Sequence, residues 1–167
     1  MDPTVITTQR ERGRESTAEI FSRILVPIDF TDASRAALAA ASEVARRFGS
    51  VVVLFHVANA GENDGFLAGT GAAWSLPDVI AVGRELLRAF AEEEQPELSS
   101  SFVYDVIGSV EVERAVSLAA TRHDATLVVI SSPHEGSFRS RSERIARELT
   151  CPVLLVHGTR PPAASPQ

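Results

Sequence analysis

Five short runs of apolar residues recur along this chain, and the segments between them repeat apolar residues at helical spacing. Two of the runs, 51–57 and 126–130, are apolar on both faces, as strands are when helices cover both sides of a parallel sheet. The alternation therefore predicts an α/β fold, a single doubly wound domain with five strands and four helices. The five runs are 23–28, 51–57, 102–107, 126–130 and 152–157.

Two of the predicted helices have clear end signals. Thr31 or Asp32 can accept the first N–H groups of a helix that ends near Gly49, a residue suited to a left-handed C-cap. Pro77 fits the first turn of a second helix, which runs to about Gln95. We expect this second helix to bury one face, made up of Val79, Val82, Leu86 and Phe90.

The other two helices are predicted from their serine caps. Ser109 can cap a helix from Val110 to about Arg122. The segment 140–143 matches a capping box and opens a helix that continues through Leu149. Each of these helices follows a predicted strand, as a doubly wound domain requires.

Length and composition fit one domain with short extensions. A chain of 167 residues is long enough to bury a single core. Residues 1–22 mix charged and polar groups and are predicted to form a flexible arm. The proline-rich stretch 159–167 is predicted to be a disordered tail. The folded domain is therefore expected to span 23–158.

Charge and residue usage exclude several classes of function. The net charge of −6 argues against a nucleic-acid partner. The 16 lysine or arginine positions are all arginine, so the chain lacks the lysine that P-loop NTPases and Schiff-base enzymes use. A lone cysteine, Cys151, and four histidines without ligand spacing exclude a disulfide framework and argue against a metal site. Because no run is long enough for a bilayer or a secretion signal, we expect a cytoplasmic protein without a membrane partner.

Polar residues follow the first and fourth predicted strands, at the edge where doubly wound folds bind ligands. Asp29 is the strongest candidate, because a carboxylate there can bond a ribose hydroxyl or hold a metal-bound phosphate. An equally weighted alternative is that Asp29 caps the following helix through its backbone N–H groups. Val57 ends the second strand, and Ile130 and Ser131 end the fourth.

The segment 131–141 is rich in hydroxyl groups and carries two arginines beside a predicted helix start. Such a segment can hold a phosphate through charge-assisted hydrogen bonds. The favoured alternative is a solvated loop in which Ser140 acts only as a cap, because Gly136 is the one glycine available for a close backbone approach. His134 beside Ser131 has no orienting acid or oxyanion hole at recognisable spacing, so no enzymatic activity is expected.

Four segments, in their order and spacing, resemble the universal stress protein family over nearly all of 22–158. They are 23–31, 54–57, 124–130 and 151–156. The resemblance implies a parallel sheet in the order 3-2-1-4-5. It also implies a homodimer through the last strand, which would cover an apolar edge that otherwise risks aggregation. The residues of that interface are Val153, Leu154, Leu155 and Val156.

One branch of that family binds ATP through glycine, two residues, glycine, nine residues, then glycine and serine or threonine. In this chain Ser131 and His134 stand at the first two glycines and Arg139 at the third, and the intervening stretch is about five residues short. The resemblance implies possible nucleotide contacts, in a degenerate site, at Pro27, Ile28, Asp29, Val57, Ile130, Ser131, Arg139 and Ser140.

These features predict a non-catalytic, dimeric stress-response protein that requires no cofactor and does not depend on tight ATP binding. One alternative is a sensor that binds ATP, AMP or another adenine nucleotide, with Arg139 and Arg141 replacing the glycine contacts. A third hypothesis, from another class, is a ligase or transferase that uses an adenine nucleotide. The chain lacks the His-x-Gly-His and Ser-Gly-Gly-x-Asp-Ser signatures of those enzymes.

Overall fold

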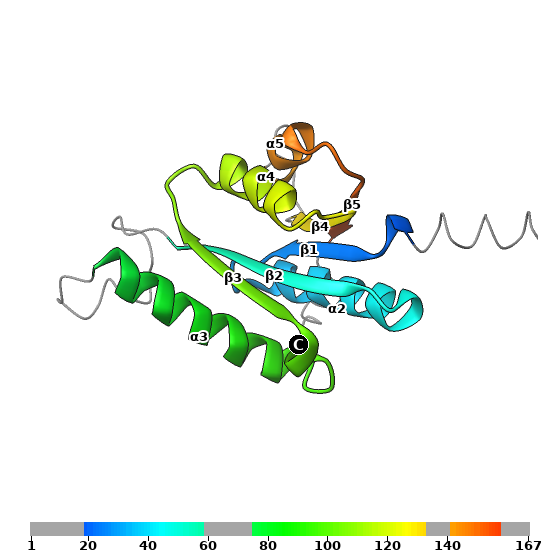
Figure 1. The fold of residues 1–167 in the computed structure, drawn as a ribbon, viewed down its shortest axis with the longest axis horizontal. Helices are drawn as coiled ribbons and strands as arrows, with labels where there is room; N and C mark the ends of the chain where they lie inside the picture. The colour runs from blue at the N-terminus through cyan, green and yellow to red at the C-terminus, as the bar shows by residue number, and fades with distance from the viewer. Residues whose placement is uncertain (1–18, 59–74, 133–140, 158–167) are drawn as a thin grey trace, which may run out of the picture.

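The computed structural model describes residues 19–58, 75–132 and 141–157 (Figure 1). The predicted tail and most of the predicted arm lie outside these ranges. So do three residues of the predicted site region, His134, Arg139 and Ser140.

Five parallel strands form one sheet, in the spatial order β3-β2-β1-β4-β5. The sheet confirms both the number of strands and the order that the family resemblance implied. β1 lies at the centre, with β2 and β4 on either side, and β5 forms one edge. The strands are β1 (Arg23–Pro27), β2 (Val51–Ala58), β3 (Val103–Gly108), β4 (Leu127–Ser132) and β5 (Val153–His157).

Four α-helices cover the sheet, two on each face, as predicted (Figure 1). α2 and α3 pack on one face and α4 and α5 on the other. None of the helices in the described ranges has the length and apolar content needed to cross a bilayer. The helices are α2 (Asp32–Phe48), α3 (Leu76–Glu94), α4 (Val112–Arg122) and α5 (Arg141–Glu148), and a short 3-10 turn occupies Ser99–Ser101.

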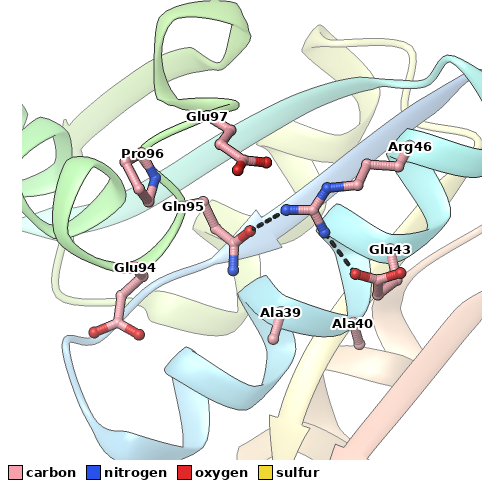
Figure 2. Close-up of a pocket in the computed structure, with 8 residues that line it drawn as sticks. All are labelled: Ala39, Ala40, Glu43, Arg46, Glu94, Gln95, Pro96 and Glu97. Carbon is pink, nitrogen blue, oxygen red and sulfur yellow. Dashed lines mark hydrogen bonds and ion pairs between the residues drawn. The ribbon is translucent and has the colours of Figure 1, made fainter.

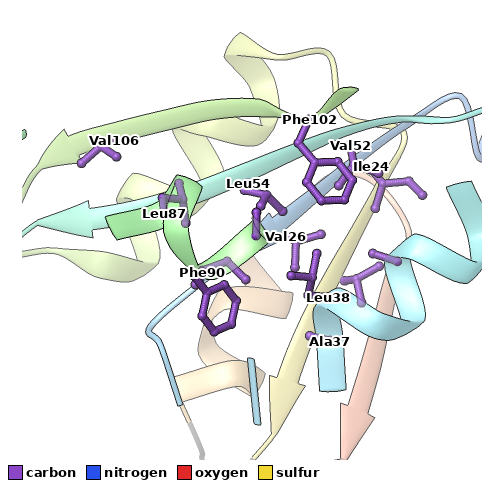
Figure 3. Close-up of a cluster of buried hydrophobic side chains, with 14 of the residues drawn as sticks. Ile24, Val26, Ala37, Leu38, Val52, Leu54, Leu87, Phe90, Phe102 and Val106 are labelled. Carbon is purple, nitrogen blue, oxygen red and sulfur yellow. The ribbon is translucent and has the colours of Figure 1, made fainter. Parts of the chain in front are cut away.

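Both faces of the sheet are buried against apolar side chains. In β1, Ile24 and Val26 point into the core under α2 and α3, whereas Leu25 points into the core under α4 and α5. Each fully buried aliphatic or aromatic side chain contributes roughly 1.5–3 kcal/mol through burial. Figure 3 shows the first core, which includes Ile24, Val26, Leu38, Leu54, Leu87, Phe90 and Phe102.

The ends of α2 follow the predicted signals. Thr31 is the N-cap, and its side chain accepts a hydrogen bond from the N–H of Ser34. Gly49 is the C-cap at φ 69°, in the left-handed region, and its N–H donates to the Ala45 carbonyl at 2.8 Å. α3 also begins as predicted, with Pro77 in its first turn and a capping box between Ser75 and Asp78.

Two of the four residues predicted for the buried face of α3, Val79 and Phe90, are buried, and the other two were each wrong by one position. Gly83 and Leu87 are buried, whereas Val82 and Leu86 are only partly buried. The cause is close packing at Gly83, where an added Cβ would lie 3.1 Å from a methyl carbon of Val106 in β3. The helix therefore turns its glycine, rather than its bulkier neighbours, toward the sheet.

The predicted start of α4 was also wrong. The helix begins at Val112 instead of Val110, and Glu111 stands at its N-cap without a side-chain cap from the described residues. The Ser109 hydroxyl oxygen accepts a hydrogen bond from the Glu111 N–H at 3.1 Å. Ser109 thus forms a local turn ahead of the helix, an arrangement that competes with capping.

Candidate functional site

The carboxyl ends of β2, β1 and β4 lie side by side and present the predicted site residues at one edge of the sheet. Pro27 is paired in register with Phe55, and the Ile28 N–H donates to the Phe55 carbonyl at 2.8 Å. The three adjacent strands thus place six of the predicted site residues at the same edge, and these residues differ in burial. Ile28 and Ile130 are buried, Pro27, Val57 and Ser131 are partly buried, and Asp29 is exposed.

Asp29 is bound into the turn between β1 and α2. One of its carboxylate oxygens accepts hydrogen bonds from the Thr31 hydroxyl at 2.6 Å and from the Thr31 N–H at 3.2 Å. Thr31, not Asp29, is the residue that caps the helix. Asp29 therefore orients the cap, and it lies exposed just after the carboxyl end of β1.

His56 and Phe30 brace this turn, a role that the sequence reasoning missed. His56 Nδ1 lies 2.8 Å from the Ile28 carbonyl oxygen, and since a carbonyl only accepts, Nδ1 carries the proton. Phe30 has a φ of 62°, uncommon for a residue with a side chain. Its ring packs on His56 at 4.7 Å and edge-on against Phe90 at 5.7 Å. In the sequence, the one feature that pointed to this role of His56 was its place at the end of a run of apolar residues.

The start of α5 is tied to the end of β4. The buried Ser142 hydroxyl donates to the Ser131 carbonyl oxygen at 2.6 Å. This bond brings the first turn of α5 to the same edge as Asp29. The predicted nucleotide contacts Arg139 and Ser140 lie outside the described residues. On either side of them in the chain, the described residues include Ser131, Ser142 and the first residues of α5.

A pair of opposite charges joins α4 to α5 near this edge. Arg144 of α5 donates to a Glu113 carboxylate oxygen at 2.5 Å. A backbone hydrogen bond at Glu113 lowers the pKa of its carboxyl group, burial opposes this, and the charges of Arg144 and Arg141 lower it further. Glu113 is therefore held as a carboxylate. Sequence reasoning missed this pair, whose members are 31 residues apart.

Two hollows among the described residues lie away from the carboxyl edge of the sheet. The larger, about 480 Å³, lies between α2 and the end of α3 (Figure 2). Three of its polar residues bond one another, since the Arg46 guanidinium donates to Glu43 at 2.5 Å and to the Gln95 side-chain oxygen at 2.9 Å. The smaller, about 200 Å³, is lined by Cys151, and burial raises the pKa of this thiol. A thiol held protonated is a poor nucleophile.

One further cluster of titratable groups ties β3 to the end of α4. The Asp105 carboxylate is bonded by Arg122 and lies 2.7 Å from His123 Nε2. Within the described ranges, no three histidine, cysteine, aspartate or glutamate side chains are placed to hold a metal ion. We therefore assign this cluster to the packing of the helix against the sheet.

Comparison with known proteins places these features in a family context. A family model described as the universal stress protein family matches residues 21–157. No curated protein matches the chain. A universal stress protein from Burkholderia pseudomallei matches with 23% identity and a TM-score of 0.59, over 82% of this chain and 96% of that one.

Two other matching structures contain nucleotides. A universal stress protein in complex with cAMP matches with 15% identity and a TM-score of 0.57, over 83% of this chain and 98% of that one. The universal stress protein from Archaeoglobus fulgidus in complex with dAMP matches with 20% identity and a TM-score of 0.52, over 81% and 98%. At these identities the structural likeness shows a shared fold.

Proposed function

The chain belongs to the universal stress protein family, and from this membership we propose that it is a non-catalytic stress-response protein that does not depend on tight ATP binding. We further propose that it assembles as a homodimer through β5. The proposal assigns it to the branch of the family without the complete glycine-rich motif.

The composition of the β4–α5 connection carries this proposal. Ser131 and His134 occupy positions where backbone amides need glycine to approach a triphosphate closely, and the connection is about five residues short. A side chain at such a position collides with the phosphate or forces the backbone into a strained conformation. The Ser131 carbonyl is also occupied by the Ser142 hydroxyl, so the strand end is already bonded to α5.

The edge position of β5 supports the dimer. Within the part of the chain that the structure describes, β5 pairs with β4 alone, and Leu154 and Leu155 are each 39% exposed. Successive residues of a strand point to opposite faces, so the edge is apolar on both. Pairing with a second copy would cover this edge and remove its tendency to aggregate.

Melting temperature in the presence of nucleotide tests the proposal. A ligand at 100 times its dissociation constant stabilises the folded state by about 2.7 kcal/mol, which raises the melting temperature by several degrees. We expect no such rise with millimolar ATP and magnesium. A rise of several degrees that saturates with ATP would contradict the proposal.

A second candidate is a sensor of adenine nucleotides with a single phosphate. Proteins of this fold have been solved with cAMP and with dAMP, and neither ligand carries a triphosphate. The family resemblance implies that Asp29 and Val57 would contact the ribose and adenine of such a ligand. This candidate predicts a rise in melting temperature with AMP that is lost in Asp29→Ala. If AMP causes no rise in the wild-type protein, the sensor hypothesis is wrong.

A further inference from the structure

The first turns of α4 and α5 meet near the carboxyl ends of the strands. α4 follows the carboxyl end of β3, and α5 is bonded to the carboxyl end of β4 through Ser142. The start of α5 carries Arg141 and, one turn later, Arg144. Two guanidinium groups at a helix start would by themselves favour a phosphate.

The carboxylate of Glu113 lies beside the start of α5, where it contacts Arg144. Its side chain is 22% exposed, whereas that of Arg144 is 57% exposed, so the carboxylate is the more enclosed member of the pair. Arg144 approaches it to 2.5 Å, and the charge of Arg141 also acts on it. The carboxylate is thus paired directly with Arg144 at the start of α5.

We propose that Glu113 is a specificity-determining residue that keeps phosphate groups from the start of α5 by occupying Arg144. A phosphate approaching Arg144 must compete with a carboxylate already in place, and it also meets the negative charge of Glu113. The inference rests on the proposed function, because it supplies a second cause of weak triphosphate binding besides the missing glycines.

The expected effect follows from the charge that is removed. Two like charges about 4 Å apart repel by about 1 kcal/mol in water, and by more where solvent is partly excluded. Glu113→Gln removes this repulsion and frees the Arg144 guanidinium. We therefore expect the affinity for inorganic tripolyphosphate and for ATP to rise by about five- to tenfold.

The test is calorimetric titration at low ionic strength, with tripolyphosphate, ATP and adenosine as probes. Glu111→Gln is the matched control, because Glu111 lies on the same helix end, pairs with Arg114 at 3.6 Å and carries the same charge. We expect E113Q to bind both phosphate compounds more tightly than the wild type, with adenosine unchanged. We expect E111Q to change affinity by less than about twofold.

A second variant tests whether the gain in phosphate affinity depends on Arg144. The double variant E113Q/R144Q should lose the increase, because the freed guanidinium is then absent. Circular dichroism establishes that each variant is folded, and Glu113→Ala replaces E113Q if the glutamine variant is not. Equal gains in E113Q and E111Q, no gain in E113Q, or a gain that survives R144Q would each overturn the inference.

The proposed function and the role of Glu113 are contradicted by different results. Tight binding of ATP by the wild-type protein would contradict the proposed function. Weak binding by the wild type together with equally weak binding by E113Q would leave the proposed function standing and would reject the role of Glu113.

Discussion

Single residues at the end of β1 hold a turn that the backbone alone would not favour. The left-handed conformation of Phe30, at φ 62°, costs roughly 1–2 kcal/mol for a residue with a side chain. The rings of His56 and Phe90 pack against Phe30, and His56 bonds the Ile28 carbonyl. These contacts offset the cost and fix the position of Asp29.

The first prediction concerns His56. His56→Ala should lower the free energy of unfolding by about 2 kcal/mol, because it removes ring packing and leaves the Ile28 carbonyl without its donor. His56→Asn, which places an amide N–H near the position of Nδ1, should recover part of this loss. Urea unfolding measures both variants. Equal stability of H56A and the wild type would show that the histidine does not brace the turn.

The second prediction concerns two buried serines of α2. The hydroxyl of Ser42 has no hydrogen-bond partner among the described residues, whereas that of Ser34 donates to the Thr31 carbonyl at 3.0 Å. Ser42→Ala should therefore stabilise the protein by about 1 kcal/mol, helped by the higher helix propensity of alanine. Ser34→Ala should destabilise it by a similar amount. A matched pair of thermal melts gives the comparison, and the same sign in both would contradict the assignment.

The ends of α2 were predictable from local signals, whereas two of the four residues predicted for the buried face of α3 were wrong. Thr31 and Gly49 act within one turn of α2, so their residue types are enough to place its ends. The orientation of α3 depends on Gly83 meeting Val106 of another strand, and periodicity contains no such contact. The start of α4 was misplaced because the Ser109 hydroxyl serves a turn equally well.

At the candidate site, the residues at the strand ends were predictable from the sequence, whereas the bonds between distant residues were not. Strand ends such as Asp29, Val57 and Ser131 could be named, and the sheet order brought them to one edge. The His56–Ile28 bond spans 28 residues, and the Arg144–Glu113 bond spans 31. Pairings over such distances depend on the packing of whole elements, so a single sequence does not reveal them.

The third prediction concerns the contact between α4 and α5. A backbone hydrogen bond at Glu113 and, to a smaller extent, the charge of Arg144 lower the pKa of its carboxyl group in the folded protein. The Glu113 carboxylate therefore stabilises the fold above the unfolded pKa of about 4.5. This contribution is lost as the pH falls through the lower, folded pKa. The wild type should therefore be more stable than E113Q at pH 7, by no more than about 1 kcal/mol for a partly exposed pair.

Urea unfolding between pH 7 and pH 3 measures the difference between the two proteins. We expect their stabilities to converge on acidification, and Glu111→Gln controls for the loss of one negative charge. A difference that stays constant over this range would mean that Glu113 stabilises the fold through packing instead of charge.

At the scale of the whole molecule, the edge strand β5 is less buried than the central strand β1. Leu154 and Leu155 are each 39% exposed, and as successive residues of a strand they lie on opposite faces. This edge is where a second copy could complete the fold.

The fourth prediction concerns this edge. Leu154→Arg together with Leu155→Arg should convert a dimer into a monomer, because charged side chains on both faces oppose pairing of the strand. Leu118→Arg, at an exposed position of α4, is the control and should leave the dimer intact. Sedimentation velocity gives the oligomeric state. A wild-type protein that stays monomeric at all concentrations would contradict dimerisation through β5.

The central claim is that this member of the family does not depend on tight ATP binding, and calorimetric titration of the wild-type chain with ATP and magnesium tests it most directly. The account predicts heats no larger than those of dilution, with no saturable binding below millimolar ATP. A saturable isotherm with a micromolar dissociation constant, abolished when Asp29 is replaced by alanine, would contradict it.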